Sequence, residues 1–86
     1  MVLAPEALQP GTFANNTMIS HSREEFILDH IMLAPPGATV VSRVVVTPAH
    51  FKRIIATMQD NLKKYETTFG PVAEGPVPPV NLGFSG

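Results

Sequence analysis

Residues 47–69 decide the fold of this chain, and they read TPAHFKRIIATMQDNLKKYETTF. Thr47-Pro48 is a typical helix start, because threonine caps the first free N–H groups and proline suits the first helical position. Gly70-Pro71 is a typical end, since glycine tolerates the backbone conformation after a last turn and proline cannot continue a helix. Between these signals the apolar residues mark one helical face of about six turns: Phe51, Ile54, Ile55, Met58, Leu62, Tyr65 and Phe69.

This helix needs a partner surface, because a single helix is marginal in water and most of its stability comes from packing. Its other face carries a mixture of charged and amide side chains, with basic residues in excess: Lys52, Arg53, Gln59, Asp60, Lys63, Lys64 and Glu66. We therefore expect the apolar face to pack on an element that precedes residue 47.

The composition bounds the class of protein. A chain of 86 residues is one domain, and its net charge of −1 argues against a nucleic-acid-binding module, which normally has a basic excess. Cysteine is absent, which excludes disulfides, thiolate metal sites and a cysteine nucleophile. No apolar run approaches the length of a membrane span, and the first eleven residues lack the basic region of a signal peptide. We expect a cytoplasmic protein that does not contact a membrane.

Three segments before the helix have the pattern of strands. Residues 12–21 alternate weakly, and Asn15-Asn16 interrupts them at a point where a bulge is one interpretation. Residues 24–33 are apolar on both faces and follow after a tight connection, so that the two segments predict an antiparallel hairpin. Residues 34–37, Ala-Pro-Pro-Gly, form a turn, and residues 39–46 are rich in β-branched valine, which favours a third strand. The predicted fold is therefore α+β: a three-stranded antiparallel sheet followed by one long helix.

This β-β-β-α order leaves one face of the sheet uncovered, because a single helix covers only one face. With the helix on one side, the other side exposes Ile27, Ile31, Val41 and Val45, or else the alternate set. A contiguous apolar patch of this kind usually marks an interface, and a symmetric dimer is its commonest form. We expect a homodimer or larger homo-oligomer that buries these four residues.

The two ends of the chain differ from this domain of residues 12–71. Residues 1–11 indicate an extended N-terminal arm, and residues 72–86 are half proline and glycine. The second segment nevertheless carries Val77, Val80, Leu82 and Phe84. Extended, proline-stiffened segments with spaced apolar residues often bind in a groove of another protein. We therefore expect this C-terminal tail to dock on a neighbouring subunit or on another protein.

Asp29 and Arg43 form the candidate structural ion pair. A carboxylate inside an apolar strand needs a partner, and an arginine on the next strand supplies one. We expect a cross-strand pair that fixes the register, since a slip of one residue would exchange the two faces of the sheet. A catalytic role for Asp29 is the alternative, but no second carboxylate lies at a useful spacing.

No other residues carry recognisable chemistry. The spacing of His21, His30 and His50 matches no compact zinc motif, so we expect no metal and no cofactor. In Ser20-His21-Ser22, neighbours on a strand point to opposite faces, which is not the geometry of a nucleophile and its base. The sequence predicts no enzyme.

Six blocks of the sequence resemble a family of short prokaryotic proteins, domain-of-unknown-function family 3467. The blocks are FAN (13–15), SHS (20–22), EFILD (25–29), RVVVTP (43–48), HFKR (50–53) and NLKKYETTFGP (61–71). The resemblance covers about residues 12–71. It implies the β-β-β-α fold and a cytosolic setting, and it supplies no catalytic residue.

The leading hypothesis is a non-enzymatic, homo-oligomeric structural or interaction protein whose C-terminal tail docks on a partner. Two alternatives remain open at this point. One is a nucleic-acid-binding regulator that uses the basic face of the helix, and the other is a chaperone-like peptide binder that uses the uncovered face of the sheet.

Overall fold

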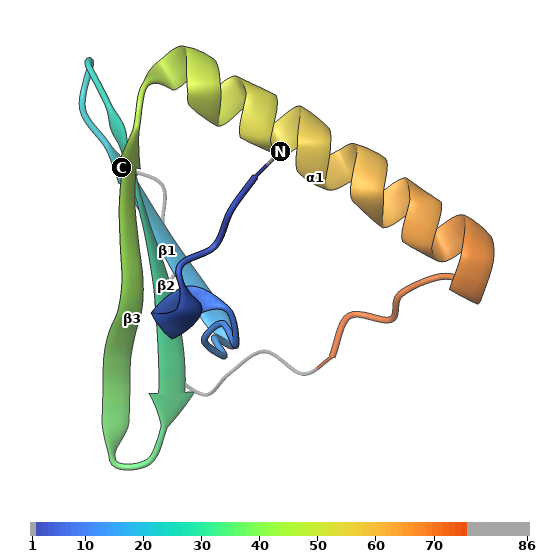
Figure 1. Cartoon of the computed structure of the whole chain (residues 1–86), viewed down its shortest axis with the longest axis horizontal. Helices are drawn as coiled ribbons and strands as arrows, with labels where there is room; N and C mark the ends of the chain where they lie inside the picture. The colour runs from blue at the N-terminus through green and yellow to red at the C-terminus, as the bar shows by residue number, and fades with distance from the viewer. Residues whose placement is uncertain (1, 76–86) are drawn as a thin grey trace.

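The computed structural model describes residues 2–75, which form a three-stranded sheet and one long helix (Figure 1). This is the predicted β-β-β-α order. A short 3-10 helix, η1, lies within the predicted N-terminal arm. The elements in chain order are η1 (Glu6–Leu8), β1 (Asn16–His21), β2 (Phe26–Ala34), β3 (Gly37–Val46) and α1 (Pro48–Phe69).

The sheet is antiparallel, with the strand order β1-β2-β3 and β2 in the centre. A tight connection joins β1 to β2, in which the amide of Ser22 donates to the carbonyl of Glu25 over 2.9 Å. Pro35 and Pro36 form the second connection, where a two-residue link leaves Ala34 paired directly with Gly37. The buried hydrophobic side chains among the described residues, Leu28 and Ile31, both belong to β2, as expected for a central strand.

Asn15 explains why β1 begins later than the sequence pattern predicts. Its amide donates to the carbonyl of Ile31, and its side chain bonds both backbone groups of Leu33: Nδ2 donates to the carbonyl over 2.9 Å, and Oδ1 accepts from the amide over 2.8 Å. The side chain of Asn15 thus replaces a backbone segment of the ladder. The predicted strand over residues 12–21 is therefore too long at its start, and residues 12–14 lie outside the sheet.

A bulge between β2 and β3 changes which valines share a face. Asp29 pairs with Arg43 and His30 with Ser42, but Ile31 pairs with Val40, so that Val41 is the extra residue of β3. Directly paired residues point to the same side of an antiparallel sheet. Val40 therefore lies beside Ile31, and the simple alternation that placed Val41 there is wrong because of the bulge.

The helix α1 has the ends that the sequence predicts. The hydroxyl of Thr47 accepts a hydrogen bond from the amide of His50 over 3.2 Å, and Pro48 is the first helical residue. At the other end Gly70 has a φ of 93°, a conformation that favours glycine, and its amide donates to the carbonyl of Glu66.

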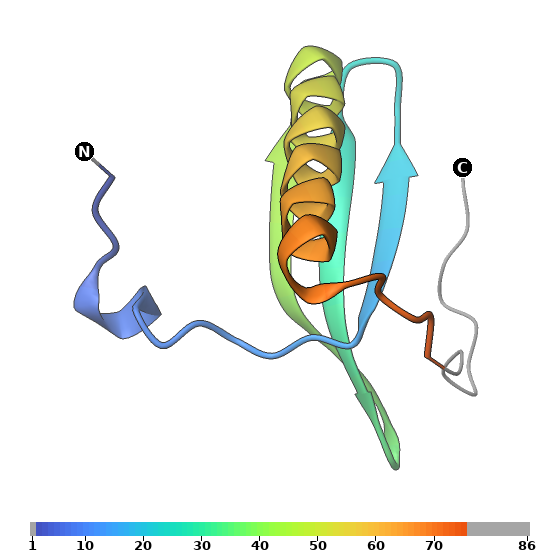
Figure 2. The ribbon, with the colours of Figure 1, turned by 90° about the vertical axis from the view of Figure 1, so that its right-hand side faces the viewer.

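The position of α1 differs from the prediction, because the helix does not lie on the sheet. It begins where β3 ends and then diverges from the strands, so that its C-terminal end is far from them (Figures 1 and 2). None of its residues is buried. The sequence pattern correctly identifies an apolar face, but the described part of the chain supplies no surface that covers its length.

We predict that Asn15→Ala lowers the free energy of unfolding by about 1 to 2 kcal/mol, since two hydrogen bonds to Leu33 are lost. Amide hydrogen exchange at Leu33 would accelerate in this variant. Asn16→Ala is the matched control, because the side chain of Asn16 accepts only from the amide of the next residue. Unchanged exchange at Leu33 in the Asn15 variant would contradict the bridging role.

Candidate functional site

One face of α1 carries a row of exposed apolar side chains. Met58 is 57% exposed, Leu62 is 49% exposed and Phe69 is 72% exposed, and Ile55 and Tyr65 on the same face are also exposed. Burying a side chain of this size contributes about 1.5 to 3 kcal/mol. We call this surface the α1 stripe, and it consists of Phe51, Ile55, Met58, Leu62, Tyr65 and Phe69.

A single aromatic contact sets the start of the α1 stripe against the sheet. The ring of Phe51 stacks on that of Phe26 in β2, with centroids 4.0 Å apart and planes inclined by 3°. His21, which pairs with Phe26 in the register, lies with its ring 5.3 Å from the same phenylalanine. The α1 stripe therefore begins on the side of the helix that faces the sheet, and it loses contact with the strands as the helix diverges.

The sheet face turned towards α1 is only partly covered. Phe26, Leu28 and Met32 alternate along β2 and therefore share this face, and Val44 pairs with Leu28. Leu28 is buried, but Met32 and Val44 are exposed. The apolar surface on the sheet thus continues that of the α1 stripe, and both lie on the inner side of the angle between helix and sheet.

The opposite face of the sheet carries most of the predicted interface, and its exposed valines are Val40 and Val45. Ile31 is only 3% exposed, Ile27 and Val41 are half-buried, and Val45 is 52% exposed. Ile31 is thus already covered within one chain. The structure brings Ile27 and Val45 together as a directly paired couple, whereas Val41 is displaced by the bulge.

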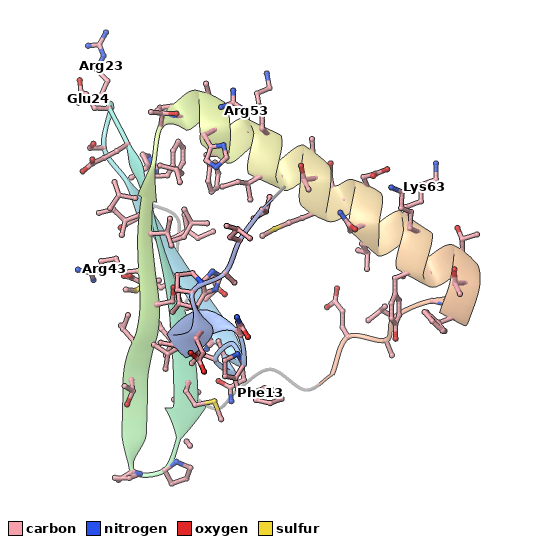
Figure 3. The ribbon with its side chains drawn as sticks, in the orientation of Figure 1. Phe13, Arg23, Glu24, Arg43, Arg53 and Lys63 are labelled. Carbon is pink, nitrogen blue, oxygen red and sulfur yellow. The ribbon has the colours of Figure 1, made fainter. Side chains whose placement is uncertain are left out.

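Asp29 and Arg43 form the cross-strand pair that the sequence pattern predicts. Arg43 Nε donates to Asp29 Oδ1 over 2.7 Å, and Arg43 Nη2 donates to Oδ2 over 3.0 Å, which gives a bidentate pair between directly paired residues. Asp29 is 2% exposed, whereas the arginine side chain is 62% exposed and points away from α1 (Figure 3). The pair therefore places a charge in the middle of the outer sheet face.

The hydrogen bonds from Arg43 lower the pKa of Asp29, against the opposing effect of burial, and the positive charge of Arg43 acts in the same direction. The same carboxylate raises the pKa of Arg43. Asp29 is therefore ionised at neutral pH, and each of its carboxylate oxygens accepts a hydrogen bond from Arg43. This arrangement suits a structural pair and leaves no proton on Asp29 for acid catalysis at neutral pH.

The three histidines lie in separate settings. His30 Nδ1 is 3.2 Å from the hydroxyl of Thr17 on the neighbouring strand, His21 contacts Phe26, and His50 contributes its backbone amide to the helix cap. Within residues 2–75, no three histidine, aspartate or glutamate side chains converge on a point that could hold a metal ion.

Two shallow hollows of the described surface both lie along α1. One, of about 280 Å³, is lined by His50, Arg53, Ile54, Thr57 and Met58. The other is lined by Asp60, Lys63, Lys64, Thr67 and Thr68. Each is formed by side chains of a single helix, so neither brings together groups from different elements as a substrate site normally does.

No helix in the described part of the chain is long and apolar enough to cross a membrane.

The predicted anchors of the C-terminal tail, Val77, Val80, Leu82 and Phe84, lie outside the described residues. The α1 stripe, by contrast, is a candidate binding surface that the sequence analysis identifies only as a core face. Its residues were found from their spacing, but their exposure depends on the direction of the helix, which no local pattern specifies.

We predict that Arg43→Met lowers the denaturation midpoint at pH 7, because the buried carboxylate of Asp29 loses its partner. The folded pKa of Asp29 lies below its unfolded value of about 4, so the pair stabilises the fold above that pH. This contribution is lost as the pH falls through the lowered pKa, and the variant and the parent protein should converge in acid.

The measurement is chemical denaturation between pH 2 and pH 7 at one fixed protein concentration. Arg53→Met is the control, since Arg53 lies on the exposed side of α1 without an ion pair among the described residues. The role of the ion pair would be contradicted if the denaturation midpoints of Arg43→Met and the parent differed by the same amount at pH 2 and at pH 7.

Comparison with known proteins places the chain in a family. A family model described as protein of unknown function (DUF3467) matches residues 3–74. The match extends further at both ends than the resemblance over residues 12–71, so that most of the N-terminal arm belongs to the family's sequence as well. No curated protein and no solved structure gives a significant match. The chain belongs to the DUF3467 family of proteins of unknown function.

Proposed function

We propose that this protein is a non-enzymatic, homo-oligomeric interaction protein. In this proposal the β-β-β-α unit builds the oligomer, and the chain from Val72 onwards docks on a neighbouring subunit or on another protein. The observation that carries the proposal is the α1 stripe, whose large apolar side chains have no cover within the described chain. Contiguous apolar surface of this size marks interaction sites in soluble proteins.

The extent of the exposed surface supports the same proposal. The chain exposes 7300 Å², whereas a compact monomer of this mass exposes about 5,000 Å². Part of the excess belongs to the N-terminal residues 2–13, which are all exposed. Residues 71–75 are also all exposed, and a helix and a sheet that do not cover each other contribute as well. Burying about 800 Å² on each partner is enough for a specific interface.

The small core makes association energetically necessary in this proposal. Only Leu28 and Ile31 are buried hydrophobic residues among those described. Two fully buried hydrophobic side chains are few for a domain of this length, because buried apolar surface has to offset most of the conformational entropy lost on folding. Small domains of this kind usually gain their stability from oligomerisation, disulfides or metals, and this chain has no cysteine.

The alternative of nucleic-acid binding through α1 has less support. Lys64 Nζ lies 3.0 Å from Asp60 Oδ2, so that one of the basic residues of the helix is paired with a neighbouring carboxylate. The remaining basic side chains of α1 are too few for the broad phosphate-binding patch of a nucleic-acid-binding protein.

We predict that light scattering gives at least twice the monomer mass for the full-length protein and for a protein that ends at Pro71. The reason is that the apolar surface of α1 and the sheet lies entirely before residue 71. The two proteins should differ in binding to a partner. The shorter protein should lose this binding, because it lacks the chain from Val72 onwards. A monomer at all concentrations in both proteins would overturn the proposed oligomer.

A further inference from the structure

The α1 stripe has a spacing that reads the same in both directions along the helix. Its members follow one another in steps of four, three, four, three and four residues: Phe51, Ile55, Met58, Leu62, Tyr65 and Phe69. Alternating steps of three and four are the pattern of helices that pack along a shared seam. Because the series is symmetric about residue 60, a second identical helix that runs in the opposite direction meets it in register.

We propose that a second copy of this chain covers the α1 stripe with its own α1, in an antiparallel pair whose twofold axis passes level with residue 60. This inference rests on the proposed homo-oligomer and names its interface. Phe51 then packs on Phe69 of the second copy, Ile55 on Tyr65, and Met58 on Leu62, and symmetry repeats each contact. Six layers bury the twelve large side chains that the two separate chains leave exposed or half-exposed.

The charges beside the seam select the antiparallel direction. Lys52 and Glu66 lie on the same flank of the α1 stripe, each one residue after a stripe residue, and Gln59 lies midway between them. An antiparallel pair brings Lys52 beside Glu66 of the second copy at both ends, with an offset of two residues, or about 3 Å, along the helix, and the two uncharged Gln59 side chains lie on either side of the axis. In a parallel pair this flank faces the other flank of the partner helix, where Ile54, Asn61 and Thr68 lie, so Lys52 and Glu66 would form no ion pair there.

Lys52 and Glu66 are available for this pairing. Lys52 makes no ion pair within residues 2–75, and Glu66 uses one carboxylate oxygen to accept from the amide of Val72 over 2.9 Å. Its other oxygen accepts no hydrogen bond from the described residues. The ion pair between Lys64 and Asp60, by contrast, lies on the opposite and fully solvated side of the helix, with both side chains more than half exposed. Only one face of α1 is therefore suited to a partner helix.

The divergence of α1 from the sheet suits a second helix at this position. The helix touches β2 through Phe51 and then leaves the strands (Figure 1), and the stripe residues from Ile55 onwards are exposed. An antiparallel partner brings the C-terminal end of its own helix, with Tyr65 and Phe69, to the end of α1 that adjoins the sheet. The exposed Val44 of β3 lies near that end, on the sheet face turned towards α1. The second copy thus covers apolar side chains of the sheet as well as those of α1.

Cysteine cross-linking tests the pairing directly, because the natural chain has no cysteine. Under mild oxidation, full-length Gln59→Cys should form a disulfide-linked dimer, since the two residues lie on the same flank of the seam, one residue from the proposed axis. The adjacent variant Asp60→Cys should remain unlinked, because residue 60 lies on the solvated side. If both variants cross-link equally, or neither does, the proposed seam is wrong.

A mixture of two further full-length variants decides the direction. Lys52→Cys and Glu66→Cys should each link poorly alone and should form the mixed disulfide when combined, because only an antiparallel pair brings these positions together. Efficient linkage of Lys52→Cys to itself, or no mixed disulfide in the combined sample, would overturn the proposal.

Substitution in the seam gives a measurement independent of cross-linking. Leu62→Lys should weaken dimerisation by about 100-fold or more, since each dimer then buries two unpaired charges. Lys63→Ala, at the next position on the solvated side, should leave the dissociation constant unchanged. Sedimentation equilibrium measures both, and circular dichroism at high protein concentration verifies that the helix is retained.

The outcomes separate this inference from the proposed function. A native mass that stays dimeric in Leu62→Lys, without a Gln59 disulfide, would keep the homo-oligomer and overturn the helix pair. A monomeric parent protein would overturn both. A monomer that binds an apolar dye only after residues 76–86 are removed would show that the chain's own C-terminal segment covers the stripe, which also contradicts the second copy as occupant.

Discussion

An apolar helix face that its own chain does not cover is the constraint on which the rest of this structure depends. α1 contacts the strands through the stacking of Phe51 on Phe26 and then diverges from them, so the stripe that continues to Phe69 is exposed in the single chain (Figure 1). Exposing these apolar side chains to water is unfavourable in free energy, and the small core of Leu28 and Ile31 does not offset this cost. Folding and association are therefore expected to be one process, as in obligate dimers.

The sheet is the part of the molecule with a well-defined internal structure. Asp29 and Arg43 fix the register of β2 and β3 at their centre, and Asn15 closes the first hairpin by bonding both backbone groups of Leu33. The same ion pair makes the outer face of the sheet less suitable for burial, because an exposed guanidinium would have to lose its water there. In the proposed oligomer, the sheet is therefore the platform and the helix supplies the apolar surface that a second copy covers.

Local patterns were sufficient to predict the elements but not their packing. The caps at Thr47 and Gly70, the spacing of the apolar residues and the valines of β3 define a helix and strands through backbone preferences and side-chain periodicity. The Asp29–Arg43 pair was also predictable, because a carboxylate in an apolar strand requires a partner. The bridging by Asn15 and the bulge at Val41 were not, since both depend on the exact pairing of two strands. The direction of α1 depends on a contact between residues 26 and 51, which periodicity within one segment does not specify. The spacing of the stripe is visible in the sequence, but helices that pack on a sheet have the same steps of three and four residues, so the spacing alone does not identify what covers the stripe.

The most direct test of the central claim is a set of isotope-filtered nuclear Overhauser measurements on a dimer assembled from labelled and unlabelled chains. The antiparallel helix pair predicts contacts between the chains from the Ile55 methyl groups to the Tyr65 ring and from the Met58 methyl group to the Leu62 methyl groups. Contacts between Tyr65 and Tyr65 of the second copy would indicate a parallel pair. The absence of any contact between the chains along α1 would contradict the claim that a second copy covers this helix.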